Sequence, residues 1–280
     1  MSSAPAPRLI SDRLTHWATE LADRPALRFQ GQERTWREWN DHLERLAGAL
    51  GGLGITRGKV VATYDKNHPS CLDLTLAAGA IGAAHAIANW RLSAEEVAYV
   101  LNDSGAEVVF VGAEFVKVLD SVRDSLPKVR EVVIVGTDGG YSDQLEALLA
   151  SATPAPLRGG EPDDTLLVLY TSGTTGFPKG AMLTHANLIA HSEALAPEFA
   201  AGHDDRYLLA MPLFHVGGIA YAFFGIRAGV PTFLTREPEA ATLIGAVKAG
   251  ATHAFLVPPV IARFLDAGEA ATGAGIGAAP

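Results

Sequence analysis

Runs of strand character alternate with runs of helical character along most of this 280-residue chain. Lys59–Tyr64 is rich in residues that favour strands, Pro69–Ile81 is apolar with helical character, and His85–Ala88 is again short and apolar. A second alternating series follows between residues 207 and 266. Neighbouring parallel strands need a long crossover connection, which a helix usually supplies. The alternation therefore predicts an α/β fold in which parallel-rich sheets are covered by helices.

A segment without periodicity divides this pattern. Residues 152–164 are rich in Pro and Gly, as is typical of a linker. The sequence thus predicts a first α/β subdomain over residues 1–151, a linker over 152–164 and a second α/β subdomain over 165–280.

Capping residues indicate where several helices begin and end. Arg37–Leu53 carries apolar residues at three- and four-residue spacing and runs into a cluster of glycines. Ser93 followed by Glu96 fits a capping box, and the helix that it starts should stop near Gly105. Thr184 is a suitable cap for a helix that extends to about residue 195.

Composition excludes several classes of function. The net charge is −9 and no stripe rich in Lys and Arg occurs, so we expect no nucleic-acid partner. The single cysteine, Cys71, cannot form an intrachain disulfide, which favours a reducing compartment and a cytoplasmic location. Cys71 itself lies in an apolar segment, where a small buried side chain is expected.

No targeting or membrane-spanning segment is predicted. The N-terminus lacks the basic and apolar regions of a signal peptide. The most apolar stretch, Leu72–Ala88, contains Asp73, Thr75 and His85, which indicates a buried helix followed by a strand and not a membrane span.

The stretch with the clearest chemical meaning follows a predicted buried strand at Leu166–Tyr170. The next residues form a loop of hydroxyls and glycines that ends near Lys179. Glycine allows the backbone N–H groups to approach an anion closely, and hydroxyls and a lysine can bind a polyphosphate. The loop is not a Walker A motif, because Lys179 follows Pro178 instead of a glycine. The alternative interpretation is a polar hairpin linker rich in small residues.

Tyr170–Gly180 resembles the signature loop of the adenylate-forming superfamily, the AMP-binding enzymes that include acyl-CoA synthetases (fatty-acid–CoA ligases), luciferases and peptide-synthetase adenylation domains. In that family the loop holds the β- and γ-phosphates of ATP while a carboxylate attacks the α-phosphorus. Carried over by position, the phosphate-binding residues are Thr171, Ser172, Gly173, Thr174, Thr175, Gly176 and Lys179.

A second segment, Met211–Gly218, resembles the border of the acyl pocket in acyl-CoA ligases. The resemblance assigns Phe214, His215, Gly217 and Gly218 to the acyl substrate pocket. We expect the glycines to leave space for a substrate and Phe214 and His215 to line it. Peptide-synthetase adenylation domains typically carry an aspartate near this segment that holds the amino group of the substrate. None occurs between Met211 and Gly218, which favours a carboxylic acid without an α-amine. For His215, a core histidine bonded to the backbone is the alternative.

The resemblance includes further positions. Asn89–Glu96 and Asp103–Ala106 resemble stretches of acyl-CoA synthetases that fix a turn and a helix start. His185 is read either as an acid/base group or, as we favour, as a residue at the start of a helix near the loop. The last four residues resemble the adenine-contacting turn of the family: Gly277, Ala278, Ala279 and Pro280.

Other catalytic classes receive little support. His185 and His191 are six residues apart, which does not match the i, i+4 spacing of two metal ligands on one helix face. We expect no metal ligand from the protein side chains, and Mg²⁺ should arrive with ATP. A serine hydrolase is not indicated, because the chain has no G-x-S-x-G motif.

The resemblance covers nearly the whole chain but corresponds only to the N-terminal portion of the family's N-terminal domain, which is an α/β fold of stacked, parallel-rich sheets. The second subdomain would be truncated, and the small C-terminal domain would be absent. The implied function is part of an ATP-dependent acyl-CoA synthetase that adenylates a carboxylic, most simply a fatty, acid and transfers the acyl group to CoA.

The resemblance is compatible with more than one function. We expect the chain alone to have weak or no activity, so a non-catalytic ATP- or acyl-binding fragment is the main alternative, and a poorly folding fragment is another. The acid's chain length, its aliphatic or aromatic nature and the choice between CoA and a carrier protein are not indicated. Neither is the oligomeric state.

Overall fold

The structure is a computed structural model of the chain, and it describes residues 7–171 and 178–272. The strands in chain order are β1 (Pro25–Phe29), β2 (Gln32–Thr35), β3 (Val60–Tyr64), β4 (Ala84–Ala88), β5 (Val108–Gly112), β6 (Glu131–Val135), β7 (Thr165–Thr171), β8 (Lys179–Thr184), β9 (Tyr207–Leu209), β10 (Thr232–Leu234) and β11 (His253–Ala254). The helices are α1 (Ile10–Glu20), α2 (Trp36–Gly52), α3 (Pro69–Ala80), α4 (Ala94–Ser104), α5 (Val116–Ser121), α6 (Leu145–Ser151), α7 (His185–Ala194), α8 (Val216–Ala228), α9 (Ala240–Lys248) and α10 (Pro258–Thr272).

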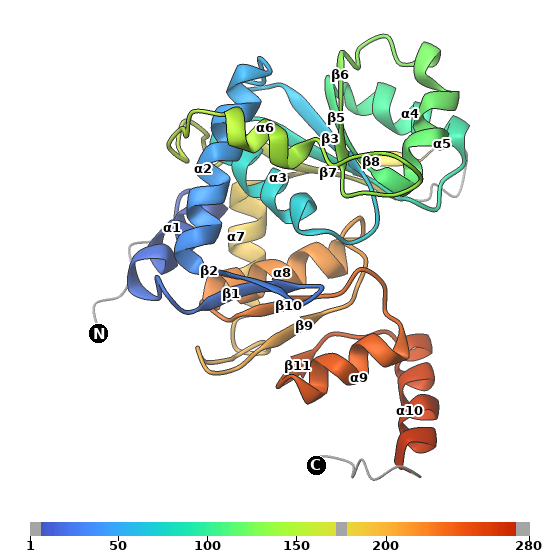
Figure 1. Cartoon of the computed structure of the whole chain (residues 1–280). Helices are drawn as coiled ribbons and strands as arrows, with labels where there is room; N and C mark the ends of the chain where they lie inside the picture. The colour runs from blue at the N-terminus through green and yellow to red at the C-terminus, as the bar shows by residue number, and fades with distance from the viewer. Residues whose placement is uncertain (1–6, 172–177, 273–280) are drawn as a thin grey trace.

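These strands form two sheets (Figure 1). The larger sheet has the order β6-β5-β3-β4-β7-β8 and is parallel except for the β7–β8 hairpin at one edge. The smaller sheet has the order β11-β9-β10-β1-β2 and is parallel except for the β1–β2 hairpin. The predicted α/β class with parallel-rich sheets is therefore confirmed.

The larger sheet takes the consecutive strands β3 to β8, whereas the smaller sheet combines β1 and β2 with β9, β10 and β11 from the other end of the chain. The hairpin of β7 and β8 completes the larger sheet, which otherwise comes from residues before 152, while β1 and β2 pair into the smaller sheet through β10. Residues 152–164 contain no helix or strand. The predicted linker thus does not separate one sheet from the other, and the division into two subdomains stays a prediction.

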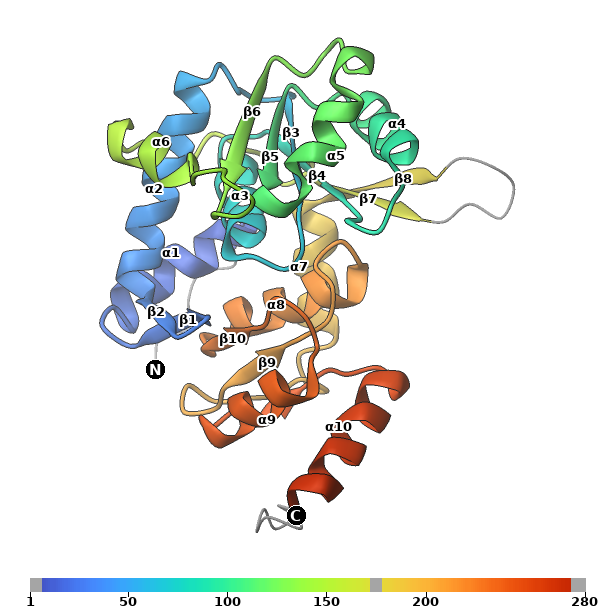
Figure 2. The same cartoon turned by 45° about the vertical axis from the view of Figure 1, so that its right-hand side comes forward.

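Side chains alternate between the two faces of the larger sheet and so build two cores. Val61 and Phe110 point to the inner face, where they meet α1, α2, α3 and α8 and the inner residues of the smaller sheet. Val109 and Val111 point to the outer face and pack under α4 and α5. A third, smaller core joins β9 and β10 to α9 and α10. Helices therefore lie between the sheets and on both outer faces (Figure 2).

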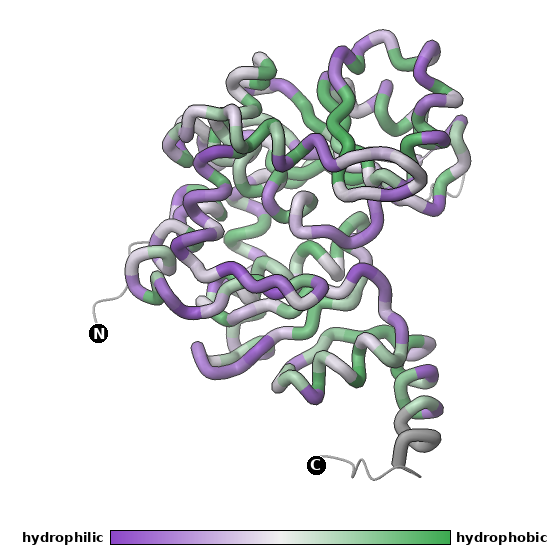
Figure 3. The backbone as a smooth tube through the Cα atoms, viewed as in Figure 1, coloured by the Kyte–Doolittle hydropathy of each residue, from purple (hydrophilic) through white to green (hydrophobic). Residues whose placement is uncertain are grey.

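The helix α3 lies at the centre of this arrangement, and every one of its residues is buried. Its surroundings are apolar, as the hydropathy colouring of Figure 3 shows for the neighbouring strands. The predicted buried helix and strand over 72–88 are confirmed, and Cys71 is a free, buried cysteine. Within the described residues, no helix has the length and apolar character needed to cross a membrane.

Most predicted boundaries agree with the structure to within two residues. Ser93 and Thr184 each form a capping box, and Gly105 ends α4 in a left-handed conformation with φ of 72°. Residues 253–257 have strand character in the sequence, but β11 pairs only through His253 and Ala254 before α10 begins at Pro258. The helix α1 and the β1–β2 hairpin were not predicted.

Candidate active site

The carboxyl ends of strands from both sheets converge at one place. Asn67, which follows β3, donates to the backbone oxygen of Met211, which follows β9, at 2.9 Å. Asp65 accepts a 2.7 Å hydrogen bond from Arg236, which follows β10. Ligands of open parallel sheets bind outside the carboxyl ends of the strands. This edge is therefore the candidate active site.

The predicted phosphate loop connects β7 and β8 at the same edge of the larger sheet. Thr171 ends β7 and pairs with Lys179, the first residue of β8. Both residues are exposed, so the hydroxyl and the ammonium group are accessible at the two roots of the loop. The other predicted positions, Ser172, Gly173, Thr174, Thr175 and Gly176, lie outside the described residues. Their role stays a prediction.

The root of this loop is attached to α4. The phenol of Tyr170 donates a 2.7 Å hydrogen bond to the carboxylate of Asp103. Gly180, opposite Tyr170 in the hairpin, leaves space for the ring, because a Cβ there would lie 3.1 Å from the Cζ of Tyr170. Burial, together with the nearby Asp103 carboxylate, raises the pKa of Tyr170, so the phenol keeps its proton and remains a donor. From the sequence, Asp103 was expected only in a structural turn.

The far end of the hairpin is fixed by His185. Its side chain is fully buried at the start of α7. Its Nδ1 accepts from the backbone N–H of Ile10 at 3.2 Å. Its Nε2 lies 3.1 Å from the carbonyl oxygen of Gly79, and because a carbonyl oxygen only accepts, Nε2 carries the proton and donates. Burial lowers the pKa of His185, which favours this neutral form. His185 therefore joins α1, α3 and α7. Its predicted place at the start of a helix is confirmed, but its predicted place near the loop is wrong, because it lies at the opposite end of the hairpin.

The segment predicted to border the acyl pocket leads from β9 into α8. His215 is exposed, and its Nδ1 accepts from the backbone N–H of Gly217 at 3.2 Å, so it caps α8. The interpretation of His215 as a core histidine is therefore wrong. The ring of Phe214 is half-buried, and the guanidinium of Arg91 lies 5.8 Å from its centroid.

The glycines of this segment serve close packing. A Cβ at Gly218 would lie 2.2 Å from the carbonyl oxygen of Pro212, and one at Gly217 would lie 3.3 Å from the ring of Phe255. The expectation that both glycines leave space for a substrate is corrected at Gly218, because the backbone of Pro212 occupies that space. The assignment of these residues to an acyl pocket stays a prediction.

A network of charged side chains, which sequence analysis missed, surrounds the convergence of the two sheets. Arg236 contacts the carboxylates of Asp65 and Glu114. Lys66 lies 3.1 Å from Glu114 and 2.9 Å from Glu237. Burial raises the pKa of Asp65 despite the neighbouring arginine. The network links the carboxyl ends of β3, β5 and β10, and no local sequence pattern indicates its members.

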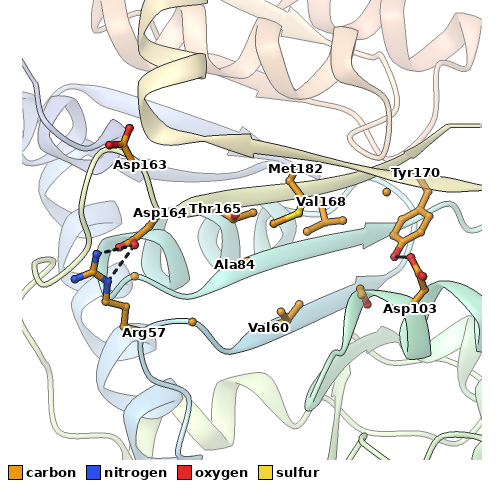
Figure 4. A pocket seen from close by; sticks show the side chains of 14 residues that line it. Arg57, Val60, Ala84, Asp103, Asp163, Asp164, Thr165, Val168, Tyr170 and Met182 are labelled. Carbon is orange, nitrogen blue, oxygen red and sulfur yellow. Dashed lines mark hydrogen bonds and ion pairs between the residues drawn. The ribbon is translucent and has the colours of Figure 1, made fainter.

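A cavity of about 470 Å³ extends from the root of the predicted phosphate loop towards the amino ends of β3 and β4. Figure 4 shows it on the outer face of the larger sheet, with the Arg57–Asp164 ion pair at one end and Tyr170 with Asp103 at the other. Val60 and Ala84, at the amino ends of β3 and β4, form part of its floor. Because ligands of such sheets bind at the carboxyl ends, we do not assign the active site to this cavity.

Within residues 7–171 and 178–272, no group of three or more His, Cys, Asp and Glu side chains is arranged to hold a metal ion. The expectation that protein side chains supply no metal ligand stays a prediction for the whole chain.

The chain is similar in sequence to several acid–thiol ligases. It is 36% identical over 199 residues to the long-chain-fatty-acid–CoA ligase FadD13 of Mycobacterium tuberculosis, across 70% of this chain and 38% of that protein. It is 36% identical over 196 residues to the indoleacetate–CoA ligase of Aromatoleum aromaticum, across 69% and 38%. It is 30% identical over 246 residues to the fatty acid–[acyl-carrier-protein] ligase ScoC of Streptomyces coeruleorubidus, across 86% and 46%. The chain thus spans less than half the length of these curated relatives.

The fold is similar to that of a solved relative. The inhibitor-bound N-terminal domain of FACL13 from Mycobacterium tuberculosis superimposes with a TM-score of 0.84 at 30% identity, over 92% of this chain and 65% of that chain. This match agrees with the resemblance to the N-terminal portion of the superfamily. The model of the family "AMP-binding enzyme" matches residues 14–276, and the chain therefore belongs to the AMP-binding enzyme family.

Proposed function

We propose that this chain is the ATP- and acid-binding part of an AMP-forming acid–thiol ligase. The observation that carries the proposal is the position of the predicted phosphate loop. Its two roots, Thr171 and Lys179, are exposed at the carboxyl end of β7, on the edge where the ends of both sheets converge. Family membership supports the same conclusion.

The proposed chemistry has two steps. A carboxylate oxygen attacks the α-phosphorus of ATP, the bond to the β-phosphate oxygen breaks, and pyrophosphate leaves. The thiol of CoA then attacks the acyl carbon and AMP leaves. In the first step, negative charge grows on the departing pyrophosphate, and Lys179 with the loop hydroxyls would stabilise it. Mg²⁺ would arrive as part of the Mg-ATP substrate, because it binds phosphate oxygens well.

The acid is proposed to be a fatty acid bordered by Phe214 and His215. Two of the relatives reported above carry fatty acids in their names, and a third is named for indoleacetate. The acceptor is proposed to be CoA, although one of these relatives is named for an acyl carrier protein. The cytoplasmic location remains a prediction that rests on the single buried cysteine.

Calorimetric titration of the purified chain with Mg-ATP tests the proposal. Lys179→Ala should weaken Mg-ATP binding on the order of tenfold or more, since an exposed charge that contacts phosphate is lost. Lys248→Ala, at an exposed position at the end of α9, is the matched control and should bind like the wild type. Absence of Mg-ATP binding by the wild type would refute the proposal.

A second assay separates catalysis from binding. Pyrophosphate release is measured with dodecanoate and with indole-3-acetate as the acid. Release that depends on the acid supports a ligase, and the faster acid indicates the substrate class. Binding of Mg-ATP without release supports the alternative of a non-catalytic ATP- and acyl-binding fragment.

A further inference from the structure

Asn67 contacts the backbone of the predicted acyl-pocket segment through both ends of its side-chain amide. Its Nδ2 donates to the carbonyl oxygen of Met211 at 2.9 Å, and its Oδ1 accepts from the N–H of Leu213 at 2.9 Å. The residue is only 5% exposed, so neither bond competes with bulk water. The amide thereby pairs with this segment much as a neighbouring strand would.

The segment has no regular structure of its own. Residues 211–215 lie between the end of β9 and the start of α8, and none of them belongs to a helix or strand. Within the described residues, no backbone group pairs with the carbonyl of Met211 or the N–H of Leu213. A buried polar group without a partner costs free energy, so the two hydrogen bonds to Asn67 hold the carbonyl of Met211 and the N–H of Leu213 in place.

The loop after β3, residues 65–68, is also linked to the side chain of Phe214 through a series of cation–ring contacts. The ammonium of Lys66 lies 5.2 Å from the ring of Trp90, and the guanidinium of Arg91 lies 4.2 Å from that ring and 5.8 Å from the ring of Phe214. Cations are attracted to aromatic faces at such distances. The loop after β3 thus holds both the backbone before Phe214 and the groups beside its ring.

The position of this loop is itself fixed by the smaller sheet. Arg236, after β10, contacts Asp65 at 2.7 Å, and its Nη1 lies 3.5 Å from the backbone oxygen of Asn67. Gly112 allows the carboxylate of Asp65 to come close, because a Cβ there would lie 2.1 Å from it. Asn67 therefore presents its amide from a fixed backbone.

We infer that Asn67 is a positioning residue for acid binding, which sets the path of Met211–Leu213 and with it the places of Phe214 and His215. The functional part of this inference rests on the proposed function, whereas its structural part does not. Asn67 touches no reacting atom in the proposed reaction. Its effect on the acid passes through the backbone that it holds.

Amide hydrogen exchange of the free chain, resolved to single residues, tests the structural part. In Asn67→Ala, the exchange rates of Leu213 and of the other amides in residues 211–218 should rise about tenfold or more. The two buried hydrogen bonds that resist local opening in the wild type are lost in this variant. Thr63→Val is the matched control. Thr63 is equally buried and bonds to His85 at 2.7 Å, but it does not contact the segment. Its exchange over residues 211–218 should equal that of the wild type.

Asn67→Asp serves as a conservative variant, which also decides the question if the alanine variant does not fold. Its carboxylate keeps an acceptor for the N–H of Leu213 and loses the donor to Met211. Protection of Leu213 should therefore persist in this variant. Loss of that protection, unchanged exchange in a folded Asn67→Ala, or an equal rise in Thr63→Val would each overturn the inference.

Calorimetric titration with dodecanoate tests the functional part. The wild type should bind, Asn67→Ala should bind on the order of tenfold more weakly, and Thr63→Val should bind like the wild type. If the wild type does not bind dodecanoate, the proposed acid site fails while the exchange result still decides the role of Asn67. Equal binding by the wild type and Asn67→Ala would overturn the role in acid binding.

Discussion

The phenol of Tyr170 donates a 2.7 Å hydrogen bond to the carboxylate of Asp103 and so joins the end of β7 to α4. The bond lies one residue before the predicted phosphate loop, at the point where the hairpin leaves the sheet. The bond therefore fixes the end of β7 from which the chain enters the predicted phosphate loop.

Tyr170→Phe should weaken Mg-ATP binding several-fold with little loss of stability. The variant keeps the ring in the space beside Gly180 and removes one hydrogen bond to a charged group, which contributes roughly 1.5–3 kcal/mol when well buried and less at this partly exposed site. Calorimetry with Mg-ATP and thermal unfolding check the two effects. Tyr141→Phe, in the loop after β6, is the control and should change neither. Unaltered Mg-ATP affinity in Tyr170→Phe would show that the loop is placed by other contacts.

Local patterns predicted those parts of the structure that depend on neighbours in sequence. Ser93 and Thr184 cap their helices because capping involves residues only three positions apart. The apolar run before Gly82 produces a fully buried helix, and its single acidic residue, Asp73, is satisfied by partners from α2 and β2. Periodicity indicates such a helix but not those partners.

The remaining features depend on residues far apart in the chain. Asn67 is 144 residues from Met211, and Asp65 is 171 residues from Arg236. Neither pair follows from a motif, because each forms only when the strands of the two sheets have taken their places. The same reason explains why the pairing of β1 with β10 was not predicted. The phosphate loop was predicted from its residue types and from the family resemblance, and most of it lies outside the described residues.

Gly218→Ala should destabilise the chain by about 1–3 kcal/mol. The new methyl group would lie 2.2 Å from the carbonyl oxygen of Pro212, so the backbone before α8 must shift. Gly245→Ala provides a control within a helix, because nothing lies within 4 Å of a Cβ there, and alanine should stabilise α9 by up to about 1 kcal/mol. Urea unfolding measures both changes. Equal stability of Gly218→Ala and the wild type would argue against tight packing at this turn.

Asp73→Asn should lower the free energy of unfolding by roughly 1.5–3 kcal/mol at pH 7, because hydrogen bonds to a buried charge are lost. The carboxylate accepts from Trp39 at 2.7 Å and contacts Arg34 and His42 at 3.1 and 3.0 Å. Burial alone would raise the pKa of Asp73, but His42 and Arg34 outweigh it and lower the pKa to about 2.

The sign of the pH effect at Asp73 follows from this lowered pKa. The stabilisation is present above the ordinary value of 3.8 and is lost as the pH falls through about 2. The difference between wild type and Asp73→Asn should consequently be smaller at pH 3 than at pH 7, by about 1 kcal/mol. Urea unfolding at both values measures it. A difference that stays constant between them would contradict the low pKa.

His85→Asn should make the stability of the chain less sensitive to acid. His85 is fully buried between the hydroxyls of Thr63 and Thr75, at 2.7 and 2.8 Å. The hydroxyl of Thr75 already donates to the carbonyl of Cys71, so Nδ1 of the ring donates to Thr75 and Nε2 accepts from Thr63. Both nitrogens are satisfied in the neutral ring, and protonation would break the bond from Thr63.

Burial lowers the pKa of His85 to about 3 from its ordinary 6.5, so the unfolded chain binds the proton first. The free energy of unfolding should therefore be unaffected by His85 above pH 6.5 and fall as the pH decreases towards 3, by at most about 1.4 kcal/mol per pH unit. His68 and His185, whose pKa values burial also lowers, keep part of this slope in the variant. Urea unfolding at pH 6.5, 5.5 and 4.5 gives the slope of the free energy of unfolding against pH, which should be shallower for His85→Asn than for the wild type. Parallel slopes would mean that the pKa of this ring is the same in the folded and unfolded states.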